Sequence, residues 1–329
     1  MSAALPRHGG DLAAATARWG EPAAGWIDLS TGINPWAYPL PSLAPDVWTR
    51  LPDAGADHAL RLAAAHRYGA PGAEWVLPAP GTSALIQALP RLLPPTEVAI
   101  LGPTYGEHAV AWDQAGHHVH LAEDIEGIGA ARAVLVVNPN NPDGRLVPPD
   151  RLAALAESLA TEGGLLVIDE AFADAVPGAS ILPRLPPATV VLRSFGKFYG
   201  LAGLRLGFAV AAPEMLAGLA AQLGPWPASG PALAIGRQAL EDDAWAADAS
   251  VRLAAAAEAV DGILAQAGLT VVGGTPLFRL ARHPDARELW HRLGRAGILV
   301  RAFIDRPDLL RVGLPADIDG LRRLALALR

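Results

Sequence analysis

Short apolar runs recur between residues 75 and 211, and most of them are continuous rather than alternating. Such runs, rich in Val, Ile and Leu, are typical of strands that are buried on both faces of a sheet. Stretches with helical spacing of apolar residues separate them. Strands that alternate with helices predict an α/β fold with a mostly parallel sheet, covered on both sides. The predicted strands are 75–78, 97–101, 133–137, 165–168, 189–192 and 206–211, and the predicted helices are 57–69, 82–93, 106–115, 149–162 and 213–223.

The pattern changes at residues 224–231, where glycine and proline predict a hinge. The Ala-rich stretch that follows predicts one long helix over 231–267. Shorter elements then predict a smaller α+β domain, to which 1–42 would contribute an N-terminal arm with turns. We therefore expect a large domain over 43–230 and a small domain made of 1–42 and 231–329. Its remaining predicted elements are shorter strands and helices near 269–272, 276–280, 285–296, 298–301, 309–312 and 316–328.

Composition excludes several classes of protein. With 51% hydrophobic and 18% charged residues, the chain is not intrinsically disordered. A net charge of −7 argues against binding to a nucleic-acid backbone. No stretch approaches the roughly 18 apolar residues of a membrane span, and the N-terminus lacks the apolar core of a signal peptide. We expect a cytoplasmic protein that binds neither nucleic acid nor membrane.

Metal and thiol chemistry is not expected. The chain has no cysteine, which excludes disulfides, a thiolate metal site and a Cys nucleophile. His117, His118 and His120 are close together but have no carboxylate pattern beside them, so we interpret them as part of a surface strand rather than as metal ligands.

Lysine usage points to one residue. Of the 26 Lys and Arg residues, Lys197 is the single lysine. Arginine carries the same charge, but it cannot lose its proton near neutral pH and so cannot act as an amine nucleophile. A lone lysine in such a composition is therefore a candidate catalytic amine.

Candidate chemical groups follow the carboxyl ends of the predicted strands, where ligands bind in sheets of this kind. They begin with small residues at a helix start, whose backbone N–H groups can bind an anion. Taken alone, each group has a structural explanation, since an acid after a strand is often a helix cap. Their order at successive strand ends indicates a cofactor site instead. The residues are Gly81, Thr82, Ser83, Tyr105, Asn141, Asp169, Ser194 and Lys197, with Arg205 just before the last strand.

This order resembles the fold-type I pyridoxal 5′-phosphate enzymes, the aspartate aminotransferase superfamily, over nearly the whole chain. The resemblance implies their fold, pyridoxal 5′-phosphate as cofactor, and a homodimer. It implies that Lys197 binds the cofactor aldehyde, and that Asp169 pairs with the pyridine nitrogen and keeps the ring an electron sink. Asn141 would hydrogen-bond the phenolic oxygen and Tyr105 would stack on the ring. The cofactor phosphate would be held by Gly81, Thr82, Ser83, Ser194 and Arg205.

Both ends of the chain narrow the resemblance. HisGlyGly at 8–10 and AspLeuSerThrGlyIleAsnPro at 28–35 are similar to the L-threonine O-3-phosphate decarboxylases of cobalamin biosynthesis. Phe172 agrees with them, because many close aminotransferases have Tyr there, and Arg301 and Arg311 match two C-terminal arginines of the family. The implied reaction converts L-threonine O-3-phosphate to (R)-1-amino-2-propanol O-2-phosphate and CO₂. The implied substrate-binding residues are His8, Gly9, Asn34, Asn141, Arg301 and Arg311.

The chain departs from these relatives at two positions. Leu51, in LeuProAsp at 51–53, replaces a Tyr that in relatives reaches the phosphate site of the neighbouring subunit. Asp11 replaces an Asn. The alternative enzyme is a histidinol-phosphate aminotransferase, which uses the same cofactor and also a phosphorylated amino substrate; the HisGlyGly arm and Phe172 favour the decarboxylase. A pyridoxal-phosphate-binding regulatory module is a further alternative, and the absence of a basic segment argues against it.

Overall fold

The computed structural model describes residues 8–329, which divide into two compact units. The large unit consists of Ala37–Asn141 and Arg145–Ala246. The small unit comprises, in its described part, 8–36, Pro142–Gly144 and Ala247–Arg329. The sequence predicts boundaries near residues 43 and 230, whereas 37–42 and 231–246 lie in the large unit.

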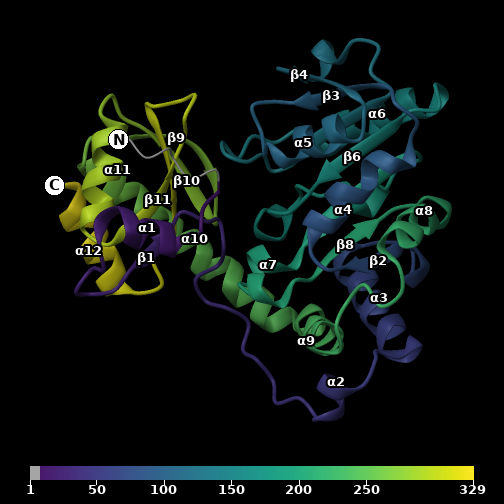
Figure 1. Cartoon of the computed structure of the whole chain (residues 1–329), viewed down its shortest axis with the longest axis horizontal. Helices are drawn as coiled ribbons and strands as arrows, with labels where there is room; N and C mark the ends of the chain where they lie inside the picture. The colour runs from purple at the N-terminus through teal and green to yellow at the C-terminus, as the bar shows by residue number, and fades with distance from the viewer. Residues whose placement is uncertain (1–7) are drawn as a thin grey trace. The chain divides into compact units, whose positions relative to one another are not determined.

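The large unit is built on a seven-stranded sheet with the order β2-β8-β7-β6-β5-β3-β4. Figure 1 shows β2 and β8 toward one end of this sheet and β3 and β4 at the other. Neighbouring strands from β7 to β4 are parallel, and β8 is antiparallel to both β7 and β2. This confirms the predicted, mostly parallel α/β sheet. The strands are β2 (Val76–Ala79), β3 (Glu97–Leu101), β4 (His118–Ala122), β5 (Ala133–Val137), β6 (Leu165–Asp169), β7 (Thr189–Ser194) and β8 (Gly207–Val210).

Helices bury this sheet because their apolar faces contact it. Leu85 of α4, Trp112 of α5 and Leu219 of α8 belong to one buried cluster with the strand residues Ile100 and Leu135. The helices are α2 (Asp46–Thr49), α3 (Ala54–Tyr68), α4 (Thr82–Ala88), α5 (Glu107–Gln114), α6 (Pro149–Thr161), α7 (Phe195–Phe198), α8 (Pro213–Leu223) and α9 (Gly230–Glu241), and α10 (Asp243–Gln266) begins here. Short 3₁₀ turns are η1 (Ala73–Trp75), η2 (Leu89–Leu92), η3 (Ile125–Ile128), η4 (Ala173–Ala175), η5 (Leu182–Arg184) and η6 (Ala202–Leu204).

Two helices that the sequence predicts as continuous are interrupted in the structure. The helix predicted over 231–267 is broken at Asp242, whose backbone leaves the helical region (φ −94°, ψ 80°). One carboxylate oxygen of Asp242 accepts from the Trp245 N–H at 2.9 Å, as a helix cap does, and the other accepts from the Tyr38 hydroxyl at 3.2 Å. The helix predicted over 82–93 gives way to a 3₁₀ turn at its C-terminal end, because Pro90 has no N–H with which to continue it.

The small unit contains a five-stranded sheet with the order β1-β11-β12-β10-β9. The N-terminal arm takes part in it, because β1 pairs in parallel with β11 and the Trp19 ring of α1 packs on Trp290 with centroids 4.8 Å apart. The sequence predicted only turns for this arm. The elements are α1 (Leu12–Trp19), β1 (Ile27–Leu29), β9 (Thr270–Thr275), β10 (Phe278–Arg282), α11 (Ala286–Arg295), β11 (Ile298–Ala302), β12 (Leu309–Gly313) and α12 (Ile318–Leu328). Among the described residues, none of the helices combines the length and apolarity that a membrane crossing requires.

Candidate active site

Residues that are distant in the sequence meet at the carboxyl edge of the large sheet. Ala79 pairs with Gly207, and Gly207 pairs with Ser194. Because β8 runs antiparallel to its neighbours, Arg205, which precedes β8, reaches the same edge as the residues that follow β2 and β7. Gly81, Ser194 and Arg205 therefore lie at one edge, as the order of motifs predicted.

The next strands bring the acid and the asparagine turn to this edge. Asp169 is the last residue of β6 and pairs with Val137 at the end of β5. The Asn138 N–H donates to the Asp169 carbonyl oxygen at 2.8 Å, so the turn that ends in Asn141 starts beside Asp169. Lys197 lies in α7, which begins directly after Ser194.

An anion-binding arrangement is present at the start of α4. Gly81 precedes the helix with a φ of +82°, and no side chain caps the helix N-terminus. A Cβ atom on Gly81 would lie 2.6 Å from Nη2 of Arg205, so the guanidinium stands directly against the backbone there. A Cβ on Gly207 would likewise come within 2.7 Å of the Thr82 nitrogen. Helix N–H groups that no side chain caps, beside a guanidinium, fit a phosphate group.

Asp169 is held in a buried environment, with 4% of its surface exposed. Its Oδ1 accepts from the Ala171 N–H at 3.0 Å, and its Oδ2 accepts from Nε2–H of His108, also at 3.0 Å. His108 is fully buried, and its Nδ1 has no hydrogen-bond partner among the described residues. A buried carboxylate requires a positively charged or hydrogen-bonding partner, and the protonated nitrogen of a pyridine ring is a partner of this kind. Sequence reasoning missed His108, because only the fold brings α5 against β6.

Two further candidate residues of the large unit, Lys197 and Tyr105, have ring contacts at this edge of the sheet. Lys197 is half-buried, and its Nζ lies 5.7 Å from the centre of the buried Phe172 ring. The Tyr105 ring follows β3 and meets His108 edge-on, with centroids 6.1 Å apart. An amine, a carboxylate, an aromatic face and a phosphate-binding turn at one sheet edge fit pyridoxal 5′-phosphate.

A buried ionic group lies beside these strand ends. Arg193 precedes Ser194 on β7, and its guanidinium contacts the carboxylates of Glu170 at 2.8 Å and of Asp174. It also lies over the ring of Tyr68, 4.3 Å from the centroid. Burial would lower the pKa of Arg193, but the charges of Asp174 and Glu170 outweigh burial and raise that pKa above its usual value. The sequence contained no signal for this group.

The small unit places two arginines opposite each other. Arg301 of β11 and Arg311 of β12 are direct cross-strand partners. Arg311 is buried, and its Nη2 donates to the Ser30 carbonyl oxygen at 2.7 Å. Burial and the charge of Arg301 lower the pKa of Arg311 to about 10, against an opposing effect of Asp28. Burial also lowers the pKa of Arg301. Like charges in cross-strand register destabilise a sheet, which is typical of a site built to bind an anion.

The HisGlyGly segment packs beside these arginines. His8, Gly9, Ser30 and Arg301 line a small cavity of about 10 Å³. A Cβ on Gly9 would lie 2.4 Å from the Ser30 carbonyl oxygen, so only glycine allows this approach. The Gly10 N–H donates to Ser30 Oγ at 2.7 Å. The two N-terminal motifs of the resemblance therefore contact each other.

Other predicted residues of this arm have local roles as well. Asn34 is buried, and its Oδ1 accepts from the Trp36 N–H at 2.9 Å. Asp11, where relatives have Asn, caps α1 by accepting from the Ala14 N–H at 2.8 Å. Both residue types are good helix caps, so this departure is conservative.

His117, His118 and His120, which are close together in the sequence, lie in different environments. His118 and His120 are exposed on the edge strand β4, as the surface-strand interpretation predicts. His117 precedes that strand and is buried; its Nε2–H donates to the Pro90 carbonyl at 2.9 Å, and its Nδ1 accepts from the Thr96 N–H at 3.2 Å. Among residues 8–329, no group of three or more His, Cys, Asp or Glu side chains could hold a metal ion.

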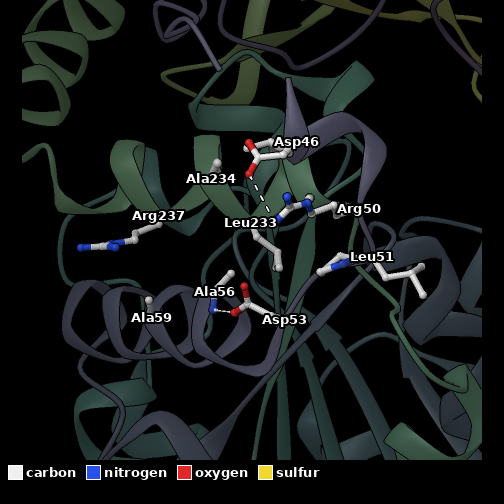
Figure 2. A pocket seen from close by; sticks show the side chains of 12 residues that line it. Asp46, Arg50, Leu51, Asp53, Ala56, Ala59, Leu233, Ala234 and Arg237 are labelled. Carbon is white, nitrogen blue, oxygen red and sulfur yellow. Dashed lines mark hydrogen bonds and ion pairs between the residues drawn. The ribbon is translucent and has the colours of Figure 1, made fainter. Parts of the chain in front are cut away.

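A separate pocket of about 290 Å³ lies among α2, α3 and α9 of the large unit. Figure 2 shows the Arg50 side chain directed toward Asp46, with an N···O distance of 3.9 Å, and Asp53 capping α3 through the Ala56 N–H. Leu51 is also at this pocket and is 68% exposed. The pocket contains none of the predicted cofactor or substrate residues.

Comparison with known proteins identifies the family. The model of the family "aminotransferase class I and II" matches residues 33–327. The chain therefore belongs to this family of enzymes, and pyridoxal 5′-phosphate is its cofactor, as predicted. It is 47% identical over 327 residues to a threonine-phosphate decarboxylase of a Sinorhizobium species, covering 98% of this chain and 97% of that protein. A threonine-phosphate decarboxylase of Pseudomonas aeruginosa is 44% identical over 325 residues, covering 98% and 96%.

Aminotransferases with a related substrate match less of the chain. A histidinol-phosphate aminotransferase of Mycobacterium tuberculosis is 37% identical over 228 residues, covering 64% of this chain and 60% of that protein. Among solved structures, histidinol-phosphate aminotransferase from Sinorhizobium meliloti, in complex with pyridoxal-5′-phosphate, has a TM-score of 0.82 at 23% identity, covering 99% and 94% of the two chains. L-threonine-O-3-phosphate decarboxylase from Porphyromonas gingivalis has a TM-score of 0.76 at 21% identity, covering 91% and 97%. These structures confirm the predicted fold.

Proposed function

We propose that this chain is a pyridoxal-phosphate-dependent carboxy-lyase that converts L-threonine O-3-phosphate to (R)-1-amino-2-propanol O-2-phosphate and CO₂, for the aminopropanol arm of cobalamin. The two relatives that match almost the full chain carry the name of this activity. The structural observation that carries the proposal is the cross-strand pair of Arg301 and Arg311, because two opposed, half-buried or buried cations favour a doubly charged anion such as a phosphate.

The large unit supplies the cofactor groups in this proposal. When bound, pyridoxal 5′-phosphate provides a sink for the electrons of a bond broken at the substrate Cα. Lys197 holds it through its aldehyde, and Asp169, oriented by His108, keeps a proton on the ring nitrogen. Asn141 binds the phenolic oxygen and Tyr105 covers one ring face. The cofactor phosphate is bound by Gly81, Thr82, Ser83, Ser194 and Arg205.

The small unit selects the reaction in this proposal. An arginine that made two hydrogen bonds to the substrate carboxylate would hold that carboxylate in place and favour loss of the Cα proton, as an aminotransferase requires. Arginines that hold the substrate phosphate instead leave the carboxylate free to depart. The Cα–carboxylate bond then breaks, CO₂ leaves, and the Lys197 ammonium or a water molecule donates the proton that Cα requires. The proposed substrate-binding residues are His8, Gly9, Asn34, Asn141, Arg301 and Arg311.

The deciding experiment offers the purified enzyme L-threonine O-3-phosphate with and without 2-oxoglutarate. We expect equal release of CO₂ and of the amino-propanol phosphate in both cases, because decarboxylation needs no amino acceptor. Formation of glutamate from 2-oxoglutarate and histidinol phosphate, without CO₂ from threonine phosphate, would overturn the proposal in favour of a histidinol-phosphate aminotransferase.

We further propose that the enzyme works as a homodimer in the cytoplasm. Three large apolar side chains in one segment of the large unit, Leu40, Trp48 and Leu51, are each between 66% and 68% exposed, which favours their burial by a second subunit. Light scattering should give twice the mass of one chain, and Trp48→Glu should reduce it toward the mass of a monomer. A monomeric wild-type protein with full activity would contradict this proposal.

A further inference from the structure

The asparagines of the turn at 138–141 have different contacts. The side chain of Asn138 bonds to the backbone of Val147 and Ala179. Its Oδ1 accepts from the Val147 N–H at 2.8 Å, and its Nδ2 donates to the Val147 and Ala179 carbonyls at 3.2 and 3.3 Å. Asn140 contacts another loop instead. It is 1% exposed, and its Oδ1 accepts from the Thr104 hydroxyl at 2.6 Å while its Nδ2 donates to the Pro103 carbonyl at 3.0 Å.

These two hydrogen bonds join the loops that follow β3 and β5. Thr104 is the residue before Tyr105, and Asn140 is the residue before Asn141. The link is reinforced by Arg145, whose carbonyl accepts from the Asn140 N–H at 2.9 Å and whose Nη2 donates to the carbonyl of Gly102, in the loop of Thr104, at 3.3 Å. The loops of Tyr105 and Asn141 are thus joined by partly buried hydrogen bonds, with the buried Asn140 side chain at their centre.

We propose that Asn140 is a positioning residue that fixes Tyr105 relative to Asn141 through Thr104. This inference rests on the proposed roles of Tyr105 at the ring face and of Asn141 at the phenolic oxygen of the cofactor. A ring held by two loops stays in place only if the two loops keep one separation. Asn140 touches neither substrate nor cofactor in this proposal and acts through its neighbours.

The amide of Asn140 suits this task because it donates and accepts at once. An aspartate would accept from Thr104 but could not donate to the Pro103 carbonyl. A leucine would make neither bond, so the Thr104 hydroxyl and the Pro103 carbonyl would both lose this partner. Thr104 offers the complementary change, because Thr104→Ser keeps the hydroxyl and Thr104→Val removes it at nearly constant volume.

The test compares Asn140→Leu, Thr104→Val and their double variant with Thr104→Ser, all in the full-length enzyme. The readouts are the dissociation constant of pyridoxal 5′-phosphate and the midpoint of the pH titration of the bound cofactor's absorbance. We expect each single variant to weaken cofactor binding about 10-fold, to shift that midpoint, and to lower kcat by about 10- to 100-fold. The double variant should be no worse than the worse single variant, because both changes remove one link. Thr104→Ser should behave as the wild type.

His117→Phe is the matched control. It removes a link of the same kind, between Pro90 and Thr96, but beside the amino end of β3 rather than its carboxyl end. We expect it to lower the Tm without changing cofactor affinity or the titration midpoint.

The proposal is overturned if Asn140→Leu and Thr104→Val lower the Tm as the control does and leave both cofactor readouts at their wild-type values. If Asn140→Leu does not fold, the comparison of Thr104→Val with Thr104→Ser decides the question. A wild type that releases no CO₂ from threonine phosphate would refute the proposed reaction, whereas the cofactor readouts would still report on Asn140.

Discussion

Replacing Arg311 by methionine separates its role in binding from its role in folding. Burial and the charge of Arg301 lower the pKa of Arg311 from 12.5 to about 10, which corresponds to a cost of roughly 3 kcal/mol for keeping this charge in the folded chain. The variant removes that cost, but it also loses the 2.7 Å hydrogen bond to the Ser30 carbonyl, which costs about 1–3 kcal/mol. The two effects oppose each other, so we expect the free energy of unfolding to change by less than about 2 kcal/mol.

The effect on the reaction should be much larger. Losing a buried, charge-assisted contact to the substrate phosphate costs about 2–5 kcal/mol, which lowers kcat/KM for L-threonine O-3-phosphate roughly 30- to 5000-fold. The preference for this substrate over free threonine should shrink by a similar factor. Because Arg311 binds the phosphate only while protonated, kcat/KM of the wild type should fall as the pH rises through about 10.

The assay is CO₂ release from threonine phosphate and from threonine, with urea denaturation in parallel. Arg279→Met is the control, since Arg279 lies on the neighbouring strand β10 and pairs with Asp261 at 2.8 Å. It should lower the stability and leave kcat/KM near the wild-type value. The reasoning is refuted if Arg311→Met keeps the full preference for the phosphorylated substrate, or if Arg279→Met loses as much activity.

Three further changes test the large unit. Lys197→Arg keeps the charge but loses the nucleophilic amine, so it should abolish both activity and the attachment of cofactor by borohydride reduction. Peptide mapping of the reduced wild type should find the label on Lys197, and a label elsewhere contradicts this assignment. Asp169→Asn cannot hold a proton on the ring nitrogen and should lower kcat by several orders of magnitude with Lys197 still labelled; a loss of only a few-fold would make Asp169 a structural cap. Arg193→Met leaves Glu170 and Asp174 buried without their cation, so urea denaturation should show a loss of about 3–5 kcal/mol; an unchanged midpoint would contradict the buried ionic group.

Much of the fold could be predicted because its signals are local. Strands 97–101 and 133–137 and helix 213–223 have their predicted bounds, since continuous apolar runs and helical periodicity are properties of short segments. The elements that were missed depend on distant partners. The strand Ile27–Leu29 is too short to be recognised by its pattern, and it forms because β11, with its start at Ile298, offers an edge to pair with. The break at Asp242 likewise depends on the Tyr38 hydroxyl and on a cap hidden in an Ala-rich stretch.

The sequence by itself determined the fold class and the candidate amine, because a lone Lys197 and polar residues after successive strands are readable along one chain. It indicated the cofactor through the resemblance of these motifs to a known enzyme family. Only the tertiary structure decided which groups surround them. His108 beside Asp169 and Asn140 against the loop of Tyr105 are contacts between residues 36 to 61 positions apart, and Arg301 and Arg311 are brought together by strand pairing. No local pattern encodes such contacts, because their energy is realised only when packing buries the polar groups and removes water as their alternative partner.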